Sequence, residues 1–573
     1  MIIKKYYNVL ALTLMTSCFA QAADQSILNM KVKQSGVYRV TYTDMMNLGI
    51  DLQGVSLDEI AVTKYGNKIA AKLVSDDLTT FGVNSYIEFI GEPEDNLYQD
   101  GIVYSVVLSA AKKIDQSNIT AQENQNVERY YTHVSNYADN LGYSFGSPTS
   151  DPWFYKRILA IGSLASTTID FDFDHMIPDG TINMSINAWG GTDYPQSPDH
   201  HVIYELNGQL IDDFRFDGVV EENRSYQLNA SQYNSGAQQL VVKLPNDTNT
   251  SADVLHIESL TVSYPREFIL MDNKLNFSHD GSSTSPSQVI DPAVIFSSGF
   301  EDSQNTVNKV NNYSIALATN ENYHIYQVYN DGMVKSVDAI NSGVCGSTAD
   351  ASCFINFSIK NDVSHLYIAA DSQLITPELS LPVIQEDINS GEAQYLIIAH
   401  PDFIGGSLND FITEKQNDFS VKVIDVEQIY AQYGTNNVSA FSIAEYIKYA
   451  QRKLGTTNVL LVGGDTYDYK NILGLDSVSF IPTIYAQTDD LIHYAPVDAK
   501  FVDVDNDNIP DLNIGRFPVR SEVELENLLQ KISAYKQKNY SNTAVFAADK
   551  FDVSTSYSFK NDANALINLL PTQ

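Results

Sequence analysis

Residues Asn458 to Arg520 read NVLLVGGDTYDYKNILGLDSVSFIPTIYAQTDDLIHYAPVDAKFVDVDNDNIPDLNIGRFPVR. The apolar run Val459 to Val462 ends in Gly463-Gly464-Asp465. A short apolar run followed by glycines is typical of a buried strand in a parallel sheet, with a functional loop at its carboxyl end. A second block, 503–518, begins with acidic residues at alternate positions and ends in Gly-Arg-Phe-Pro. The stretch therefore predicts part of an α/β domain.

The segments around this stretch alternate between strand and helix patterns. We expect further strands at 395–399, 421–425 and 544–548, and helices at 408–418, 439–454, 522–539 and 561–570. Such alternation implies parallel strands joined by right-handed crossovers. Ligands of these sheets bind beyond the carboxyl ends of the strands. Those ends carry His400, Asp425, Gly463-Gly464-Asp465 and Asp549.

Upstream of residue 393 the patterns are almost entirely those of β-strands. We expect a β-rich domain over 23–150, a second over 151–265, and a third β-rich region with two cysteines over 266–392. The second has evenly spaced alternating strands and an Asn207-Gly208 hairpin turn, which favours a jelly-roll-like sandwich. The predicted fold is therefore multidomain, with β-rich domains followed by a mainly parallel α/β domain over 393–573.

The charge balance excludes some classes of partner. The 573 residues include 35 Lys plus Arg and 71 Asp plus Glu, a formal net charge of -36. Nucleic acid and anionic membrane surfaces would repel such a chain, whereas divalent cations would be attracted to it. A hydrophobic content of 43% indicates globular cores rather than disorder.

The amino terminus has the features of a secretory signal peptide over residues 1–22. Lys4 and Lys5 precede the apolar run Val9 to Met15, and Ala20-Gln21-Ala22 resembles a cleavage site. We therefore expect a secreted or cell-surface protein. A lipoprotein anchor at Cys18 is the alternative. No later segment is apolar for long enough to span a membrane.

Two cysteines remain after removal of the signal, Cys345 and Cys353. In an exported protein, two nearby cysteines most often form a structural disulfide, which is the pairing we predict. The alternative makes one of them a catalytic thiol. Asp199, His200 and His201 offer metal-ligand side chains, but no further ligand follows at helical spacing, and a solvated loop is the favoured interpretation.

The acidic block places carboxylates at positions one, three, five and nine of a loop: Asp503, Asp505, Asp507 and Asp511. Alternating Asp residues that fold around one hard cation predict a structural Ca²⁺ site. Asn508, at position six, is suited to the positive φ that such loops require. Position twelve is Ile514 and not Glu, so the loop is not an EF-hand. A solvated acidic turn is the alternative.

The ordered motifs of the α/β region resemble those of the gingipain-like cysteine peptidases. They are 395–403 (YLIIAHPDF), 460–465 (LLVGGD), 466–470 (TYDYK), 481–483 (IPT), 509–511 (IPD), 514–519 (IGRFPV) and 531–535 (KISAY). The resemblance covers about residue 394 to the end of the sequence. The upstream β domains are similar, more loosely, to those of larger members such as the sortases of type nine secretion.

The resemblance implies a caspase-like α/β domain in which a Cys attacks the peptide carbonyl. A His within a Gly-His-Gly segment moves the proton, and an acidic residue at a strand end orients the His. The segment 545–549 (VFAAD) is similar to the family strand that ends in this carboxylate, so Asp549 is the catalytic candidate. An ordinary capping or loop Asp is the alternative for this position.

The sequence departs from the family pattern at the dyad. It contains no Gly-His-Gly, and no Cys follows Cys353. We therefore expect the domain to be incomplete at its C-terminus and this chain alone to be inactive. The predicted function is a secreted cysteine endopeptidase acting on proteins or peptides, represented by its pro-region and first catalytic half.

Two rival functions remain. One is a secreted, non-catalytic binding or adhesion protein built on a degenerate peptidase scaffold. The other is a nucleotide-binding domain, prompted by Gly463-Gly464-Asp465. The sequence supports this nucleotide-binding function only weakly, since the chain contains neither a phosphate-loop lysine motif nor the dinucleotide fingerprint.

Overall fold

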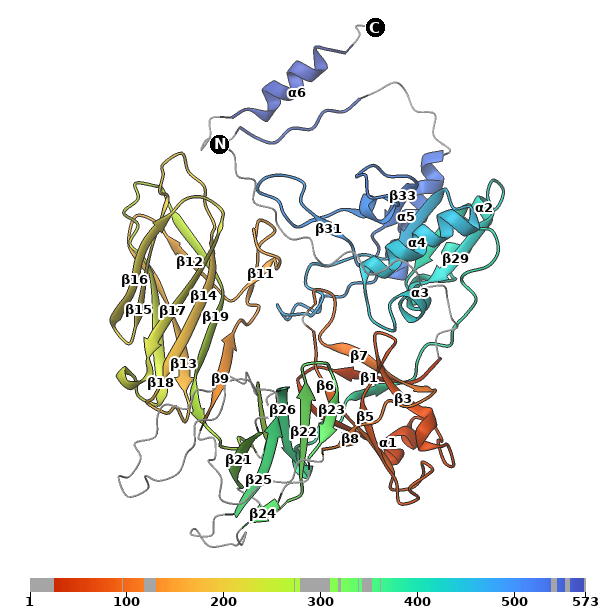
Figure 1. The fold of residues 1–573 in the computed structure, drawn as a ribbon. Helices are drawn as coiled ribbons and strands as arrows, with labels where there is room; N and C mark the ends of the chain where they lie inside the picture. The colour runs from red at the N-terminus through yellow and green to blue at the C-terminus, as the bar shows by residue number, and fades with distance from the viewer. Residues whose placement is uncertain are drawn as a thin grey trace, which may run out of the picture.

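The computed structural model (Figure 1) describes residues 25–94, 96–117, 130–272, 274–278, 310–317, 321–337, 340–342, 353–360, 362–536, 544–551 and 557–570. These residues form three β-rich units followed by an α/β unit, which confirms the predicted multidomain architecture. The predicted signal peptide and Cys345 lie outside the described residues.

The first β unit consists of two antiparallel sheets around a core that includes Met30, Val62 and Phe89. One sheet has the order β27-β1-β7-β3-β4, with β1 Ser26–Val32, β3 Ile60–Lys64, β4 Asn67–Ile69, β7 Ile102–Leu108 and β27 Glu378–Ser380. The other has the order β2-β6-β5, with β2 Gly36–Thr41, β5 Ala71–Val74 and β6 Tyr86–Gly91. Helix α1, Tyr42–Asn47, begins with a capping box between Thr41 and Asp44.

The second unit is the predicted β-sandwich, lying at the left of Figure 1. One sheet contains β9 Tyr130–Tyr137, β12 Lys156–Ala160, β14 Thr181–Gly190, β17 Glu221–Asn229 and β19 Asp253–Glu267. The other contains β13 Ala165–Phe173, β15 His200–Leu206, β16 Gln209–Phe216 and β18 Gly236–Leu244. Asn207 and Gly208 both have positive φ, as a two-residue hairpin turn requires.

The third β unit also has two sheets. The first joins β8 Asp115–Gln116, β20 Lys274–Ser278, β22 Tyr323–Tyr329, β23 Val334–Ser336 and β26 Val363–Ala370. The second joins β21 Val310–Leu317, β24 Ile340–Ser342 and β25 Cys353–Lys360. Strand β8 follows the strands of the first unit in sequence but pairs with β23 of the third unit. Strand β27 follows the strands of the third unit but pairs with β1 of the first. These two strands therefore link the first and third units.

A buried polar network strengthens this link. Glu88 of β6 is fully buried and accepts hydrogen bonds from Arg39 Nε at 2.8 Å and from the Tyr326 hydroxyl. His324 Nδ1 lies 3.3 Å from Glu88, and its Nε2 lies 2.9 Å from Asp371. Burial would raise the pKa of Glu88, but its hydrogen bonds and the neighbouring His324 and Arg39 lower it to about 2.

The α/β unit contains a four-stranded parallel sheet of order β29-β28-β30-β33. Its strands are β28 Tyr395–Ala399, β29 Val421–Asp425, β30 Asn458–Val462 and β33 Asn513–Phe517. The helices are α2 Leu408–Lys415, α3 Val426–Tyr433, α4 Ala440–Leu454, α5 Glu522–Lys536 and α6 Phe559–Ile567. The predicted parallel sheet is therefore confirmed, and α3 is an element that the sequence reading missed.

Alternate residues of the central strands supply two cores, because successive side chains of a strand point to opposite faces. Leu396, Ile398 and Leu461 pack with α3 and α4. Ile397, Ala399, Leu460 and Val462 pack with α2 and α5. Burial on both faces explains the continuous apolar runs of β28 and β30.

The predicted strand at 544–548 is wrong for this structure. Residues 544–551 form no strand and are exposed, with Val545 at 89%. Their apolar pattern fits a strand, but it contains nothing that specifies the neighbour with which such a strand would pair. Helix α6 forms close to its predicted position and has no buried residue. Within the described part of the chain, no helix has the length and apolar character needed to cross a membrane.

Candidate functional site

Three polar segments meet at the carboxyl edge of the parallel sheet, as predicted. The register pairs Ala399 of β28 with Asp425 of β29 and with Val462 of β30. His400, Asp425 and the loop that begins at Gly463 therefore leave the sheet at the same level. This edge is where α/β sheets bind their ligands.

His400 and Asp425 have local structural roles at this edge. The His400 ring caps the short 3₁₀ helix Pro401–Phe403 and accepts from Asp402 N at 3.3 Å. The Asp425 carboxylate caps α3 by accepting from Glu427 N at 2.9 Å. Burial lowers the pKa of His400 and raises the pKa of Asp425, so burial opposes the charged form of each.

The loop after β30 requires a glycine. Gly463 has φ +147°, and a Cβ there would lie 2.8 Å from the Cβ of Phe480 and 2.9 Å from Ile481 Cγ1. The absence of a side chain lets the 480–481 backbone approach, and Phe480 N donates to Gly464 O at 2.9 Å. The glycines therefore allow two loop segments to pack closely together.

Asp465 follows these glycines and is largely enclosed. Its carboxylate accepts from Ser479 Oγ at 2.7 Å and from the Tyr469 hydroxyl at 2.9 Å. Burial raises the pKa of Asp465 against the lowering effect of these hydrogen bonds. A partly buried carboxylate with a raised pKa at a strand end is the strongest candidate for a ligand-binding group at this edge.

Arg516, in the Gly-Arg-Phe-Pro segment, is a structural clamp that sequence reasoning did not assign. Its guanidinium binds both oxygens of Asp498, at 2.8 and 2.7 Å. It also donates to the carbonyl oxygens of Gly463 at 3.0 Å and Ile481 at 2.6 Å. The Arg516 side chain therefore holds together the loop that follows β30 and the loop that precedes the 3₁₀ helix Asp498–Phe501. The charge and the planar fork of Arg are the sequence signal for such a role.

Asp549 does not join this edge in the structure. It lies in the exposed segment 544–551, and its carboxylate accepts from the backbone N of the next residue, Lys550, at 2.7 Å. The predicted strand end is absent, so the structure does not bring Asp549 to the predicted His and Gly residues.

The acidic loop brings three of its four predicted ligands together. Ligand atoms of Asp503, Asp505 and Asp511 all lie within 4.8 Å of one another. Asp507 is outside this group, and its carboxylate accepts from Ile509 N at 2.8 Å. Asn508 has φ +69°, as its position in the loop predicted.

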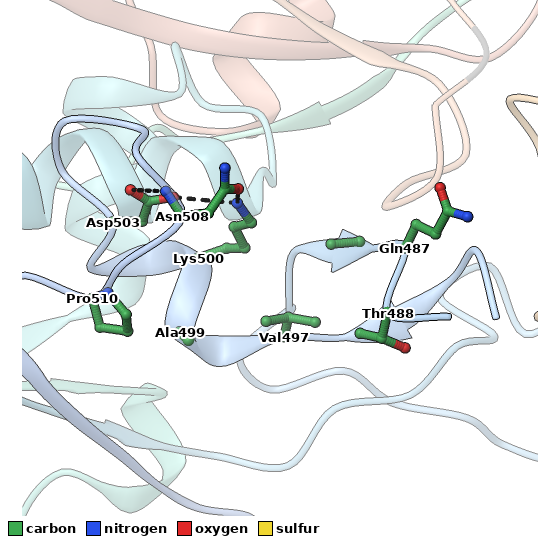
Figure 2. Close-up of a pocket in the computed structure, with 9 residues that line it drawn as sticks. Gln487, Thr488, Val497, Ala499, Lys500, Asp503, Asn508 and Pro510 are labelled. Carbon is green, nitrogen blue, oxygen red and sulfur yellow. Dashed lines mark hydrogen bonds and ion pairs between the residues drawn. The ribbon is translucent and has the colours of Figure 1, made fainter. Parts of the chain in front are cut away.

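Lys500 lies beside this cluster. Figure 2 shows its ammonium directed toward Asn508 and Asp503. The Lys500 Nζ atom lies 2.6 Å from Asn508 Oδ1 and 3.2 Å from Asp503 Oδ2, and all three residues line a cavity of about 230 Å³. Asp503 is buried, whereas Asp505 and Asp511 are exposed. The ammonium offsets part of the charge of Asp503 and leaves the other two carboxylates without a cation among the described residues.

The expectation of a solvated loop at His200 and His201 is wrong, because both are buried in β15. His200 Nδ1 lies 2.6 Å from Asp253, and its Nε2 lies 3.0 Å from Thr192 O. His201 lies between Asp247 at 2.7 Å and Asp213 at 2.8 Å. Every ring nitrogen of this pair has a protein partner, so neither ring presents a free metal-ligand position.

The carboxyl edge offers no thiol among the described residues. The described cysteine, Cys353, belongs to β25 of the third β unit. The predicted disulfide with Cys345 falls outside the described residues. Nucleophilic thiol chemistry at this edge therefore needs a group from elsewhere.

Comparison with known proteins finds a family match over the α/β unit. Residues 388–572 match the family described as peptidase family C25, so the resemblance to the gingipain family is confirmed for this part of the chain. No curated protein matches the chain.

One of the solved structures that match has a similar architecture. The dimeric latent PorU from Porphyromonas gingivalis has a TM-score of 0.60 at 14% identity, with 90% of this chain and 50% of that chain covered. The likeness shows a shared fold, and this chain spans half the length of that one. The CBM36-1 domain of a multidomain xylanase from the hindgut metagenome of Trinervitermes trinervoides has a TM-score of 0.15 at 12% identity, covering 23% of this chain and 96% of that domain.

Proposed function

We propose that this chain provides the scaffold of an exported cysteine endopeptidase of the gingipain type, with peptide bonds of proteins or peptides as substrates. The observation that supports this most strongly is the peptidase family C25 match, which falls on the parallel α/β unit. The upstream β units then serve as a pro-region. The reacting Cys and its His base are supplied by residues outside these 573, because neither has its family motif here.

Asp549 is proposed as the carboxylate that orients the His. This role requires residues 544–549, which form no strand in this structure, to add a parallel strand beside β33 in the catalytically complete domain, with α5 as the right-handed crossover. This pairing moves Asp549 to the edge that holds His400 and Asp465. Asp549→Asn in an active enzyme then slows turnover at an unchanged melting temperature, as loss of an orienting carboxylate does.

A thiol-directed label tests the assignment of the nucleophile. The longest chain that the reading frame encodes is treated with a peptidyl chloromethyl ketone, digested and sequenced by mass spectrometry. The expected product carries one modification, on a Cys after residue 573. Modification of Cys345 or Cys353 would overturn the proposal. No modification at all would support the alternative of a binding protein on a degenerate scaffold.

We also propose that the acidic loop binds Ca²⁺. Asp503, Asp505 and Asp511 provide hard oxygen donors in one group, and calcium prefers such ligands. Asp507, the fourth predicted ligand, has its carboxylate turned to the backbone of its own loop. Lys500 must give up its contact with Asp503 when the ion binds, which tunes the affinity of the site.

Export is proposed from the signal peptide over 1–22 and predicts an oxidised Cys345–Cys353 pair. Seven residues separate the two cysteines, so the closed loop is short and adds stability at the low end of roughly 2–4 kcal/mol. Reduction of the native protein should raise its intact mass by two hydrogen atoms. Alkylation of both thiols without prior reduction would contradict the disulfide.

A further inference from the structure

A buried histidine lies at the end of the loop that joins β14 to β15 in the sandwich. His200 is the first residue of β15, and like Asp199 and Asp253 it has no exposed surface. The loop before it, residues 191–199, has no regular secondary structure and is exposed at its centre. The His200 ring stacks on Phe216 with 4.4 Å between the centroids. This packing fixes the direction in which each ring nitrogen points.

Both ring nitrogens of His200 face oxygen atoms. Nε2 lies 3.0 Å from Thr192 O, a carbonyl oxygen that can only accept, so Nε2 must carry a hydrogen. Nδ1 lies 2.6 Å from Asp253 Oδ1, and a contact this short needs a proton between the two atoms. A neutral imidazole has one N–H group and a carboxylate has none. The two contacts therefore coexist only while His200 and Asp253 hold one extra proton.

Two buried carboxylates favour this proton. Asp253 Oδ2 accepts from His201 N at 3.1 Å. Asp199 Oδ1 lies 3.6 Å from His200 Nε2 and accepts from Gly218 N at 2.8 Å. Burial lowers the pKa of His200, but the hydrogen bond to Asp253 and the charges of Asp253 and Asp199 outweigh burial and raise this pKa above its ordinary 6.5.

The other charged groups beside β15 contact His201 and not His200. They are Asp247, Asp213 and Arg215, and the His201 side chain points to the opposite side of the strand. Among the described residues, no Lys or Arg forms an ion pair with Asp199 or Asp253. Loss of the proton from His200 would therefore leave two buried carboxylates without a cation, which is costly.

His256 of β19 shows how a buried histidine of the same sandwich behaves without such partners. It is 6% exposed, its ring stacks on Trp189 at 3.8 Å, and its Nδ1 has no hydrogen-bond partner. Burial, followed by the charge of Arg157, lowers the pKa of His256 to about 3, so this ring is neutral. The oxygen partners of His200, and not its burial, therefore hold its extra proton.

We propose that His200 is a proton-dependent latch, whose protonated ring joins Thr192 of the loop 191–199 to Asp253 of β19. Loss of the proton removes one of the two N–H groups, so the bond to Thr192 or the bond to Asp253 breaks. The loop is held at pH values below 6.5 and loosens as the pH rises through the raised pKa of the folded protein. The latch uses no residue of the α/β unit, so it is independent of the proposed peptidase function.

Hydrogen–deuterium exchange with mass spectrometry of the 573-residue chain tests the latch. The amides of Tyr194 and Gly218 report on the loop because both donate to Asp199, and the amides of β13 and β18 report on the whole sandwich. Exchange rates from about pH 5 to about pH 9 are divided by those of the urea-unfolded chain, which removes the intrinsic effect of pH. Protection of the loop should fall about tenfold or more toward the alkaline end, and protection of β13 and β18 should stay constant.

Asp253→Asn distinguishes a latch from an ordinary buried ion pair. The amide oxygen of the variant can accept from His201 N while its NH₂ group donates to Nδ1 of a neutral His200 ring, whose Nε2–H still reaches Thr192 O. The loop should then stay protected at alkaline pH, whereas loss of an ordinary ion pair would loosen it at every pH. His175→Gln, which changes an exposed histidine of the same unit, is the matched control and should keep the wild-type profile.

Three results would overturn the proposal. One is constant protection of the loop 191–199 over the whole pH range, and another is an alkaline loss of protection that β13 and β18 share. The third is an Asp253→Asn protein whose loop loosens at alkaline pH as much as the wild-type loop does. The wild-type profile decides between the first two results and the expected one even if Asp253→Asn fails to fold.

Discussion

Glu88 is the residue whose surroundings give the clearest pH dependence. Its pKa of about 2 in the folded protein lies below its ordinary value of 4.5, so its stabilising effect is present above pH 4.5 and is lost as the pH falls toward 2. His324 behaves in the opposite sense. Its pKa is raised above 6.5, mainly by Glu88 against the effect of burial, so its stabilising effect fades on the alkaline side. The link between the first and third β units should therefore be strongest between pH 4.5 and pH 6.5, the range in which both groups contribute fully.

Glu88→Gln tests this network. The variant leaves Arg39 and His324 near a neutral amide in a buried site, so the unfolding free energy of these units should fall by about 3–5 kcal/mol near pH 6. The deficit should shrink as the pH approaches 2. Urea unfolding across this pH range is the measurement. Glu94→Gln, which alters an exposed pair with Lys64, is the control and should change little.

Arg516 makes a second prediction at this scale. Arg516→Lys keeps the charge but loses the two-oxygen contact with Asp498 and the bonds to Gly463 and Ile481. Stability should fall by about 2–3 kcal/mol, and protease cleavage within 466–500 should become faster. Arg452→Lys at the exposed end of α4 is the matched control. Equal protease sensitivity of the two variants would refute the clamp.

At the scale of the element, three of the four predicted calcium ligands of the acidic loop cluster together, and Asp507 lies apart from them. If calcium binds the three clustered carboxylates, Asp505→Asn should abolish the fall in melting temperature that chelator causes. Asp507→Asn should preserve that fall, because Asp507 lies outside the cluster. Saturation at 100 times the dissociation constant should add about 2.7 kcal/mol. Melting curves that ignore both calcium and chelator would exclude the site.

The strands show what local sequence can and cannot specify. Val459 to Val462 was predicted correctly because burial on both faces demands an unbroken apolar run, which few other elements produce. The same kind of run at 544–548 forms no strand in this structure, since a strand also needs a partner edge. Helix α3 was missed because it follows β29 directly, with Asp425 acting as both strand end and helix cap.

At the scale of the molecule, the sequence predicted that β-rich units precede an α/β unit, but it did not predict the contacts that join the units. Short-range patterns identify a sandwich or a parallel sheet, and both are confirmed. The pairing of β27 with β1, and the contact of segment 142–154 with the α/β unit, join residues hundreds of positions apart. No local pattern encodes such a contact. The contact between His200 and Asp253, which lie 53 positions apart, could likewise be found only in the folded structure.

The central claim is that these residues are the scaffold of a thiol peptidase whose reacting groups lie elsewhere. Hydrolysis of a mixed fluorogenic peptide library, by this 573-residue chain and by the longest chain of the reading frame, tests it most directly. We predict cleavage by the longer chain that thiol alkylation abolishes, and none by the shorter one. Alkylation-sensitive cleavage by the 573-residue chain itself would contradict the account and would place the nucleophile at Cys345 or Cys353.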